Sequence, residues 1–247
     1  MSIYQYFQEI AREKGAGYFI LIDPDKLEKH AILDLAAKAS SGGADAILVG
    51  GSLLLSSGLD DLIQAIKETA SIPVVIFPGN IMQISRHADA ILFLSLISGR
   101  NPNYLIGEQV RAAPIIRQYG IEPISTGYML IESGRLTSAE FMSNTRPIPR
   151  DKHDIAKATA LAAEYLGMRL LYLEAGSGAA QPVSTDLIHS VARYSSLPII
   201  AGGGIRTPEQ ARERIAAGAS FIVTGNVLET SPNGKLIAEF ASAIHSQ

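Results

Sequence analysis

The sequence predicts a single (β/α)8 barrel, a TIM barrel, that includes all 247 residues of the chain. Three observations carry this prediction. Eight short apolar runs are separated by helical stretches in all intervals but one, these runs are continuously apolar, and two glycine-rich turns of the phosphate-binding type come last in the chain. Continuously apolar strands are typical of a parallel sheet that is buried on both faces. A doubly wound sheet is the competing fold, but eight units in this length favour the barrel.

The composition agrees with one globular domain and excludes several classes of protein. Hydrophobic residues make up 47% of the chain and charged residues 18%, which supplies a large core. The net charge of -3 gives no sign of the basic surface that nucleic-acid-binding proteins carry, so nucleic acid is not an expected partner. The chain contains no cysteine, which excludes disulfides and thiolate metal sites. Neither a signal peptide nor a membrane anchor is apparent, and we expect a cytoplasmic protein.

The predicted elements follow one another in a regular order. An amphipathic helix at residues 2–14 precedes the repeat and would cover the barrel floor or one flank. Eight strands are expected at residues 18–22, 46–49, 74–77, 90–94, 122–126, 170–173, 197–201 and 220–224. Helices are expected near residues 31–40, 59–69, 104–119, 154–166, 184–194, 208–217 and 235–244.

One interval departs from the repeat. Only residues 78–87 separate the third strand from the fourth, which leaves scarcely enough chain for a full helix. The third unit of the barrel is therefore the one that departs from the strand-and-helix pattern.

The last two strand-to-helix turns carry the strongest functional signal. The run AGGGIRTPEQ follows the seventh strand, and Gly225-Asn226 follows the eighth. Glycines without side chains leave backbone N–H groups free to face an anion, and barrels commonly bind phosphate at this place. A single glycine turn is usually only a tight turn, but two at the same depth favour a phosphate site.

Polar residues that follow the first two strands are candidates for a metal site. Asp23 comes directly after the first strand, and Ser52 follows Gly50-Gly51 after the second. Mg2+ prefers one or two carboxylates together with waters and substrate phosphates. Asp23 could instead belong to a charged turn, and Ser52 could be only a helix cap.

The sixth strand ends in Tyr172-Leu173-Glu174 before a Gly-Ser-Gly turn. Tyr172 and Glu174 face the same side by alternation, and the turn can surround an anion. A glutamate at the end of an apolar strand costs several kcal/mol unless it is solvated or paired. It would act as a general base or accept a substrate hydroxyl, although a buried arginine could pair with it instead.

Two further candidates lie after the neighbouring strands. Arg100, after the fourth strand, could bind an anionic oxygen or form a surface salt bridge, and Tyr128, after the fifth, could contact a second substrate. The five histidines lack metal-ligand spacing, and no Ser-His-Asp motif is present.

Taken together, these residues resemble the geranylgeranylglyceryl phosphate synthase family, which also includes bacterial heptaprenylglyceryl phosphate synthases. The resemblance covers essentially the whole chain and is most specific in LIDPDK (21–26), SLISGRNPNYLIGEQ (95–109) and YLEAGSGA (172–179). The resemblance implies a modified barrel whose third helix is non-helical. It also implies an Mg2+-dependent prenyltransferase that joins the C3 hydroxyl of sn-glycerol 1-phosphate to a polyprenyl diphosphate as an ether and releases diphosphate.

Carried over position by position, the resemblance implies a role for each candidate. Asp23 and Ser52 would form the Mg2+ site, Glu174 would accept the proton of the attacking hydroxyl, and Tyr128 would line the reacting centre. The remaining matches, with Arg100 as a further candidate from its position, would bind substrate: Tyr172, Leu173, Glu174, Ala175, Gly176, Ser177, Gly178, Gly203, Gly204, Gly225 and Asn226.

The resemblance also bears on chain length, assembly and location. The heptaprenyl branch carries a lysine two residues before the metal aspartate, whereas this chain has Leu21, which favours a geranylgeranyl donor. Family members form dimers or hexamers, so we expect a homo-oligomer; Phe141-Met142 could be an interface patch or could pack over the barrel. The lipid substrate and product also suggest peripheral contact with the membrane.

Two rival functions stay open at this stage. A phosphosugar isomerase or cyclase would share both phosphate turns, but it typically needs an acid or base after the fifth strand, where this chain has Gly127-Tyr128. A non-catalytic barrel that binds a phosphorylated ligand would not need Asp23 or Glu174.

Overall fold

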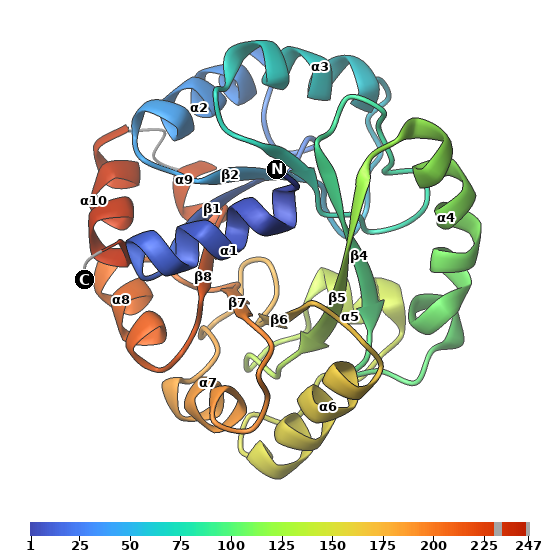
Figure 1. Cartoon of the computed structure of the whole chain (residues 1–247), viewed down its shortest axis with the longest axis vertical. Coiled ribbons are helices and arrows are strands. Elements are labelled where there is room, and N and C mark those ends of the chain that lie inside the picture. The colour runs from blue at the N-terminus through green and yellow to red at the C-terminus, as the bar shows by residue number, and fades with distance from the viewer. Residues whose placement is uncertain (230–233, 246–247) are drawn as a thin grey trace.

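The structure, a computed structural model, describes residues 1–229 and 234–245 and confirms the predicted barrel (Figure 1). Eight parallel strands pair in chain order, and the first strand closes the barrel against the last. The strands are β1 (Gly17–Ile22), β2 (Ala46–Val49), β3 (Val74–Ile76), β4 (Ala90–Leu96), β5 (Glu122–Leu130), β6 (Leu170–Glu174), β7 (Ile199–Gly202) and β8 (Phe221–Thr224).

Most of the helices surround this barrel as an outer ring, and α1 (Ile3–Lys14) lies across one end of it (Figure 1). The other helices are α2 (Lys29–Ser41), α3 (Leu59–Thr69), the π-helix η1 (Asn103–Gly107), α4 (Glu108–Tyr119), α5 (Ser138–Ser143), α6 (His153–Tyr165), α7 (Thr185–Ala192), α8 (Pro208–Ala216), α9 (Asn226–Glu229) and α10 (Gly234–Ile244). Every helix within residues 1–229 and 234–245 is too short or too polar to span a lipid bilayer.

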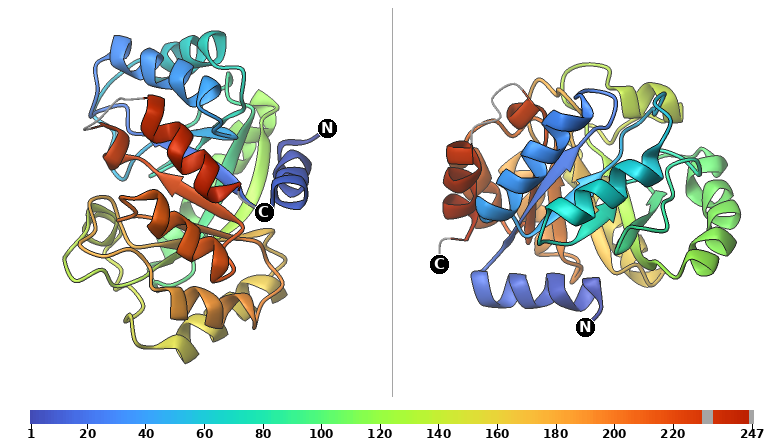
Figure 2. Two further views of the ribbon diagram at one scale, coloured as in Figure 1. Left: turned by 90° about the vertical axis from the view of Figure 1, so that its left-hand side faces the viewer. Right: turned by 90° about the horizontal axis from the view of Figure 1, so that it is seen from above.

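Helix α1 closes the N-terminal end of the barrel, as one of the two sequence expectations had it (Figure 2). Phe7 reaches in from α1 and packs against Phe19 and Phe221, with ring centroids 4.6 and 5.7 Å away. The carboxylate of Glu122, at the start of β5, accepts the otherwise unsatisfied backbone N–H groups of Ile3 and Tyr4. The floor is therefore fixed by packing and by hydrogen bonds, and the opposite end of the barrel carries the loops that follow the strands.

Strand alternation divides the apolar residues into two cores. Side chains such as Phe19, Leu48, Leu92 and Tyr172 point into the barrel, and a larger set lies between the strands and the helices. Tyr172 is one of the inward residues of β6, and Glu174 lies two positions farther along the same strand. By alternation Glu174 therefore also faces the barrel interior rather than the helices.

The boundaries differ from the sequence predictions in several places. Strand β5 runs to Leu130, four residues farther than predicted, because it pairs with β4 and β6 along this length. Tyr128 therefore lies within a strand rather than after one. The helix expected from residue 104 begins as the π-helix η1, and α5 and α9 are additional short helices.

The non-helical interval after β3 is confirmed. Residues 77–89, all of which the structure describes, form turns and bends and contain no helix. This leaves the outer face of β3 and β4 without the helix that other units of the barrel have.

Asp45 connects the two ends of the chain below the barrel. Its carboxylate is 1% exposed, accepts from Lys14 Nζ at 2.5 Å and from the Tyr18 amide at 2.8 Å, and lies 2.7 Å from His245 Nε2. The pKa of Asp45 is lowered: burial raises it, but these hydrogen bonds and the nearby His245 outweigh burial. This one side chain thus ties α1, β1 and the end of α10 to β2.

We predict that Asp45→Asn destabilises the fold. The substitution leaves Lys14 and His245 without their carboxylate, which should cost about 2–3 kcal/mol and lower the melting temperature by about 4–12 °C. Since the folded-state pKa of Asp45 is below its unfolded value, the stabilisation is present above about pH 4 and is lost as the pH falls through the folded pKa. The matched control is Asp34→Asn in the exposed pair with Lys38, which should change stability by less than about 1 kcal/mol. Equal effects of the two substitutions would contradict the role of Asp45.

Candidate active site

A cavity of about 510 Å³ opens at the end of the barrel where the strands finish. Its walls come from the loops after β1, β2, β5, β6, β7 and β8. The predicted residues that line it are Asp23, Ser52, Tyr128, Tyr172, Glu174, Ser177, Gly178, Gly203, Gly204, Gly225 and Asn226. The barrel therefore brings together side chains that are up to about 200 residues apart in sequence.

Glu174 is the buried acid of this cavity. It is 5% exposed, and its carboxylate accepts the backbone N–H of Gly176 at 2.6 Å. Burial raises the pKa of Glu174 to about 7, while the Gly176 amide acts in the opposite direction. The neighbouring Tyr172 hydroxyl also favours the ionised form, although it makes no hydrogen bond of normal geometry. A carboxyl group that titrates near neutral pH can accept a proton from a substrate.

Three aromatic rings lie beneath the mouth of the cavity. Phe77 stacks on Tyr172 at a centroid distance of 5.0 Å, and Tyr128 is tilted against both rings, at 5.8 and 5.4 Å. The buried Tyr172 hydroxyl has no hydrogen-bond partner among the described residues, and it lies beside Glu174. This layer separates the polar cavity from the apolar barrel core, and it presents aromatic faces to whatever binds above.

The predicted phosphate turns meet on one side of the cavity. Gly203 has φ +79°, and a Cβ atom there would lie 2.2 Å from Glu174 Oε1, so only glycine fits. The Ser177 hydroxyl donates to Asn226 Oδ1 at 3.0 Å and so links the turn after β6 to the turn after β8. Backbone amides in these turns, with the Ser177 and Asn226 side chains, form a polar wall that suits an anion.

Asp23 and Ser52 follow β1 and β2, and the loop after β1 is the neighbour of the turn after β8 in the closed barrel. A Cβ atom at Gly51 would lie 3.0 Å from Asp23 Oδ2, so this glycine leaves one face of the carboxylate open. The described residues contain no cluster of three or more histidine or acidic ligands that could hold a metal by themselves. One carboxylate with a hydroxyl fits the mode in which Mg2+ is shared with substrate phosphates.

The loop that carries Ser52 is held by residues outside the predicted set. Gln83, fully buried in the non-helical segment, accepts from the amides of Gly51 and Gly79 at 3.2 Å and donates to the Gly51 carbonyl at 2.8 Å. Asp25 accepts from the amides of Leu55 and Ser56 at 2.6 and 2.9 Å. Asp25 therefore organises this loop, and both of its oxygens are occupied by backbone groups.

An apolar groove joins the cavity at Gly51, Ser52, Phe77, Tyr128 and Ala139, which line both. It runs along β4 and the non-helical segment where the third helix is missing, and it is covered by η1, α4 and α5. Its other walls are mainly apolar side chains, namely Ile81, Ile84, Ile91, Leu92, Phe93, Leu94, Leu96, Ala112, Ile116 and Met142.

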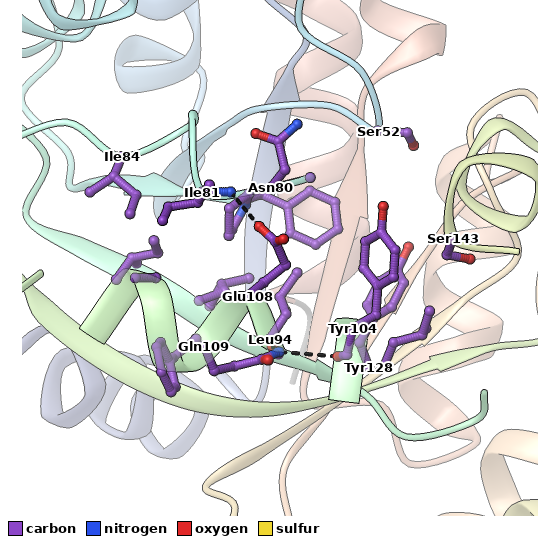
Figure 3. Close-up of a pocket in the computed structure, with 18 of the residues that line it drawn as sticks. Ser52, Asn80, Ile81, Ile84, Leu94, Tyr104, Glu108, Gln109, Tyr128 and Ser143 are labelled. Carbon is purple, nitrogen blue, oxygen red and sulfur yellow. Dashed lines mark hydrogen bonds between the residues drawn. The ribbon is translucent and has the colours of Figure 1, made fainter. Parts of the chain in front are cut away.

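Polar side chains fix the outer wall of this groove. Glu108 accepts the backbone N–H of Ile81 at 2.9 Å (Figure 3). Gln109 donates to the Leu94 and Tyr104 carbonyls, and Ser95 donates to the Leu105 carbonyl at 2.7 Å. Two of these carbonyls, those of Tyr104 and Leu105, belong to η1, and π-helices occur frequently at functional sites.

The structure does not bring every predicted residue to the site. Arg100 Nη1 donates to the Gly99 carbonyl at 2.7 Å, and Arg100 is absent from the linings of both cavities as the structure describes them. The arrangement of Arg100 among the described residues thus corresponds neither to the substrate contact that we predicted nor to the alternative surface salt bridge. Leu173 and Ala175 belong to the outer core, because alternation turns their side chains away from the barrel interior.

Several residues of the site were not predicted from the sequence. Lys26 and Glu229 line the cavity, and Gln83, Glu108 and Gln109 support the loop and the groove. Glu108 and Gln109 fall inside the matching segment 95–109, Lys26 ends the matching segment 21–26, and Glu229 ends a further segment that resembles the family, VTGNVLE (223–229). These four residues could have been predicted from the segments that resemble the family. Gln83 lies in a stretch that has no recognisable motif.

We predict that Glu174→Gln stabilises the protein at high pH. Because the folded-state pKa of Glu174 is raised, the group's contribution to stability is full below about pH 4.3 and is lost as the pH rises through about 7. The neutral variant avoids burying a charge, so its melting temperature should exceed that of the wild type at pH 8 and converge with it near pH 5. The exposed Glu132→Gln provides the control. A difference between Glu174→Gln and the wild type that does not change with pH would contradict the assignment.

We predict that Gln83→Leu loosens the loop that carries Ser52. The variant loses three hydrogen bonds to the backbone of Gly51 and Gly79, which should cost about 2–3 kcal/mol. Hydrogen exchange should accelerate at these two amides more than at the amides of β6. Gln118→Leu on the exposed face of α4 is the control. Uniform acceleration across the whole barrel would show that Gln83 supports global stability only.

Comparisons with known proteins agree with the geometry. The sequence pattern of the PcrB family matches residues 8–244. Among curated proteins, the geranylgeranylglyceryl phosphate synthase of Chitinophaga pinensis is 48% identical over 245 residues, which cover 99% of this chain and 96% of that protein. The protein of the same name from Thermococcus kodakarensis is 47% identical over 223 residues, 90% of this chain and 87% of that one.

Solved structures give the same result. The crystal structure of (S)-3-O-geranylgeranylglyceryl phosphate synthase from Thermoplasma acidophilum, in complex with substrate sn-glycerol-1-phosphate, matches with a TM-score of 0.94. It is 36% identical, and the match covers 99% of both chains. A thiamine phosphate pyrophosphorylase from Pyrococcus furiosus, at 15% identity and a TM-score of 0.57, shares the fold alone. The chain belongs to the PcrB family, together with the geranylgeranylglyceryl phosphate synthases.

Proposed function

We propose that this chain is a geranylgeranylglyceryl phosphate synthase, a phosphoglycerol geranylgeranyltransferase of ether phospholipid biosynthesis. The reaction forms a C–O bond between C1 of the prenyl donor and the C3 oxygen of sn-glycerol 1-phosphate. The bond from C1 to diphosphate breaks, and the hydroxyl proton is lost. The observation that carries this proposal is the joining of an apolar groove to a polar cavity that contains a buried carboxylate and an open aspartate.

Glycerol phosphate would occupy the wall made by the turns after β6, β7 and β8. Amides at Gly203-Gly204 and Gly225-Asn226 would bind its phosphate, and residues 172–178 would surround its glycerol part. Tyr172 supports this placement, since its buried hydroxyl needs a partner and faces the same part of the cavity.

Glu174 would hold and deprotonate the attacking hydroxyl. Its raised pKa, about 7, matches the requirement of a general base near neutral pH. The rings of Tyr128, Tyr172 and Phe77 lie beside it, and their faces can stabilise positive charge that develops on the prenyl carbon.

Asp23 and Ser52 would hold Mg2+ between the protein and the donor diphosphate. The open face of Asp23 next to Gly51 supports a metal that is shared with substrate. When bound, Mg2+ would neutralise negative charge on the departing diphosphate.

The prenyl chain would extend into the groove along β4. The groove begins at Gly51 and Ser52, so a diphosphate at Ser52 would direct its hydrocarbon tail past Phe77 and Tyr128 and onward to α4. The geranylgeranyl donor is favoured by Leu21 and by the names of the relatives.

Assembly and location remain expectations of the sequence. A homo-oligomer, either a dimer or a hexamer, is supported by the exposure of Phe141, at 71%, and of Met142, at 41%. The expected location is the cytoplasm, and peripheral contact with the membrane would suit the lipid nature of the substrate and product.

We predict that the purified protein forms the prenyl ether from geranylgeranyl diphosphate, Mg2+ and sn-glycerol 1-phosphate. Mass spectrometry should detect the product, and chelation should abolish it. Glu174→Gln should lower kcat about 100-fold or more while glycerol phosphate still binds, because only the proton acceptor is removed. For the wild type, kcat/KM should rise with pH up to about 7, as Glu174 ionises.

The control variant is again Glu132→Gln, which should keep full activity. Unchanged turnover in Glu174→Gln would remove this residue from the mechanism. Failure of the wild type with geranylgeranyl, farnesyl and heptaprenyl donors would overturn the proposed reaction.

A further inference from the structure

Lys26 is a cation between the two sides of the active-site cavity. Its ammonium donates to Ser177 Oγ at 3.1 Å and lies 3.5 Å from Glu229 Oε1 and 3.6 Å from Asp23 Oδ2. These three partners come from the loops after β6 and β1 and from α9 after β8. The side chain is 34% exposed, so part of the ammonium remains accessible from the cavity that it lines.

Glu229 holds Lys26 in this place. Its side chain is 13% exposed, and its position at the end of α9 puts its carboxylate beside the cavity. Ser177, which accepts from Lys26, donates in turn to Asn226 Oδ1 at 3.0 Å. The Lys26 ammonium is thus the end of a hydrogen-bonded chain through Ser177 and Asn226, which lie in the turns after β6 and β8. It also lies near Asp23, the proposed metal ligand.

The proposed reaction needs a cation at this point. It brings a phosphomonoester with about two negative charges next to a diphosphate, and both lie in a partly enclosed cavity where repulsion is screened less than in water. Mg2+ at Asp23 would neutralise charge on the diphosphate side only. Arg206, another cation of the lining, donates its guanidinium N–H groups to the Ala179 and Ala180 carbonyls.

We propose that Lys26 binds both substrate anions and offsets the repulsion between them, with Glu229 as its positioning residue. This inference rests on the proposed function and adds a residue to it. A compact ammonium with three donors can face Ser177 and two anionic oxygens at once. Lys26 would therefore couple the binding of the two substrates rather than strengthen either one alone.

The test measures this coupling by calorimetry with the full chain. The affinity for sn-glycerol 1-phosphate is determined with Mg2+ alone and again with saturating Mg2+ and inorganic diphosphate. In Lys26→Met, diphosphate should weaken glycerol phosphate binding at least 10-fold more than it does in the wild type. Lys26→Arg should restore part of the coupling, because the positive charge is retained. Lys29→Met, on the exposed first turn of α2, is the matched control and should behave as the wild type.

A double-mutant cycle tests the role of Glu229. Glu229→Gln should weaken the coupling less than Lys26→Met does, and the double variant should be no worse than Lys26→Met alone. Additive losses would remove Glu229 as a positioning residue, and unchanged coupling in Lys26→Met would overturn the proposal for Lys26.

Product formation separates this inference from the proposed function. If the wild type forms the prenyl ether and Lys26→Met keeps the wild-type kcat, KM values and coupling, only the role of Lys26 fails. If the wild type forms no ether with any donor, the reaction itself fails. Equal losses in Lys26→Met and Lys29→Met would assign the effect to general surface charge and would also overturn the role of Lys26.

Discussion

The pairing of the first strand with the last is the interaction on which the rest of the structure depends. β1 and β8 are in register from Gly17 opposite Phe221 to Ile20 opposite Thr224. Phe19 stacks on Phe221 inside the barrel at 4.9 Å, and the Tyr18 and Thr224 hydroxyls meet outside it at 2.8 Å. Closure in this register places the residues after β1 beside those after β8, so the proposed metal ligand Asp23 and the proposed phosphate turn at Gly225-Asn226 are neighbours in the wall of one cavity.

The same closed barrel makes the ionised form of Glu174 costly in free energy and makes its carboxylate useful as a proton acceptor. An apolar interior, with aromatic rings directly below the carboxylate, raises its pKa toward neutrality, because burial disfavours the charged form. One short bond from the Gly176 amide offsets only part of that cost. Reactivity and stability are therefore opposed at this residue, since the ionised form that can accept a proton is the form that the fold stabilises least.

Much of the fold and a large part of the site could be predicted from the sequence, because strand alternation and glycine turns are local signals. Asp23, Glu174 and Gly203 were found in this way, and all three line the cavity. The supporting residues depend on tertiary contacts that no spacing reveals: the Gln83 amide contacts a loop about 30 residues away, and Lys26 meets Glu229 only after closure. The structure does not place Arg100 in the cavity, although its position after a strand is suitable, because its side chain turns back and hydrogen-bonds its own loop.

The missing third helix is what distinguishes this barrel from a phosphosugar enzyme with the same phosphate turns. A helix packed on β3 and β4 would bury their outer faces, whereas the non-helical segment leaves a groove whose walls are mainly aliphatic. A sugar phosphate has no hydrocarbon tail to fill such a groove, and a barrel that only bound phosphate would gain nothing from it. Within β5, two residues before its end, Tyr128 lines both the groove and the cavity, and its side chain is neither the acid nor the base that an isomerase would need. The loss of one helix therefore favours a substrate with a charged head and a long apolar tail.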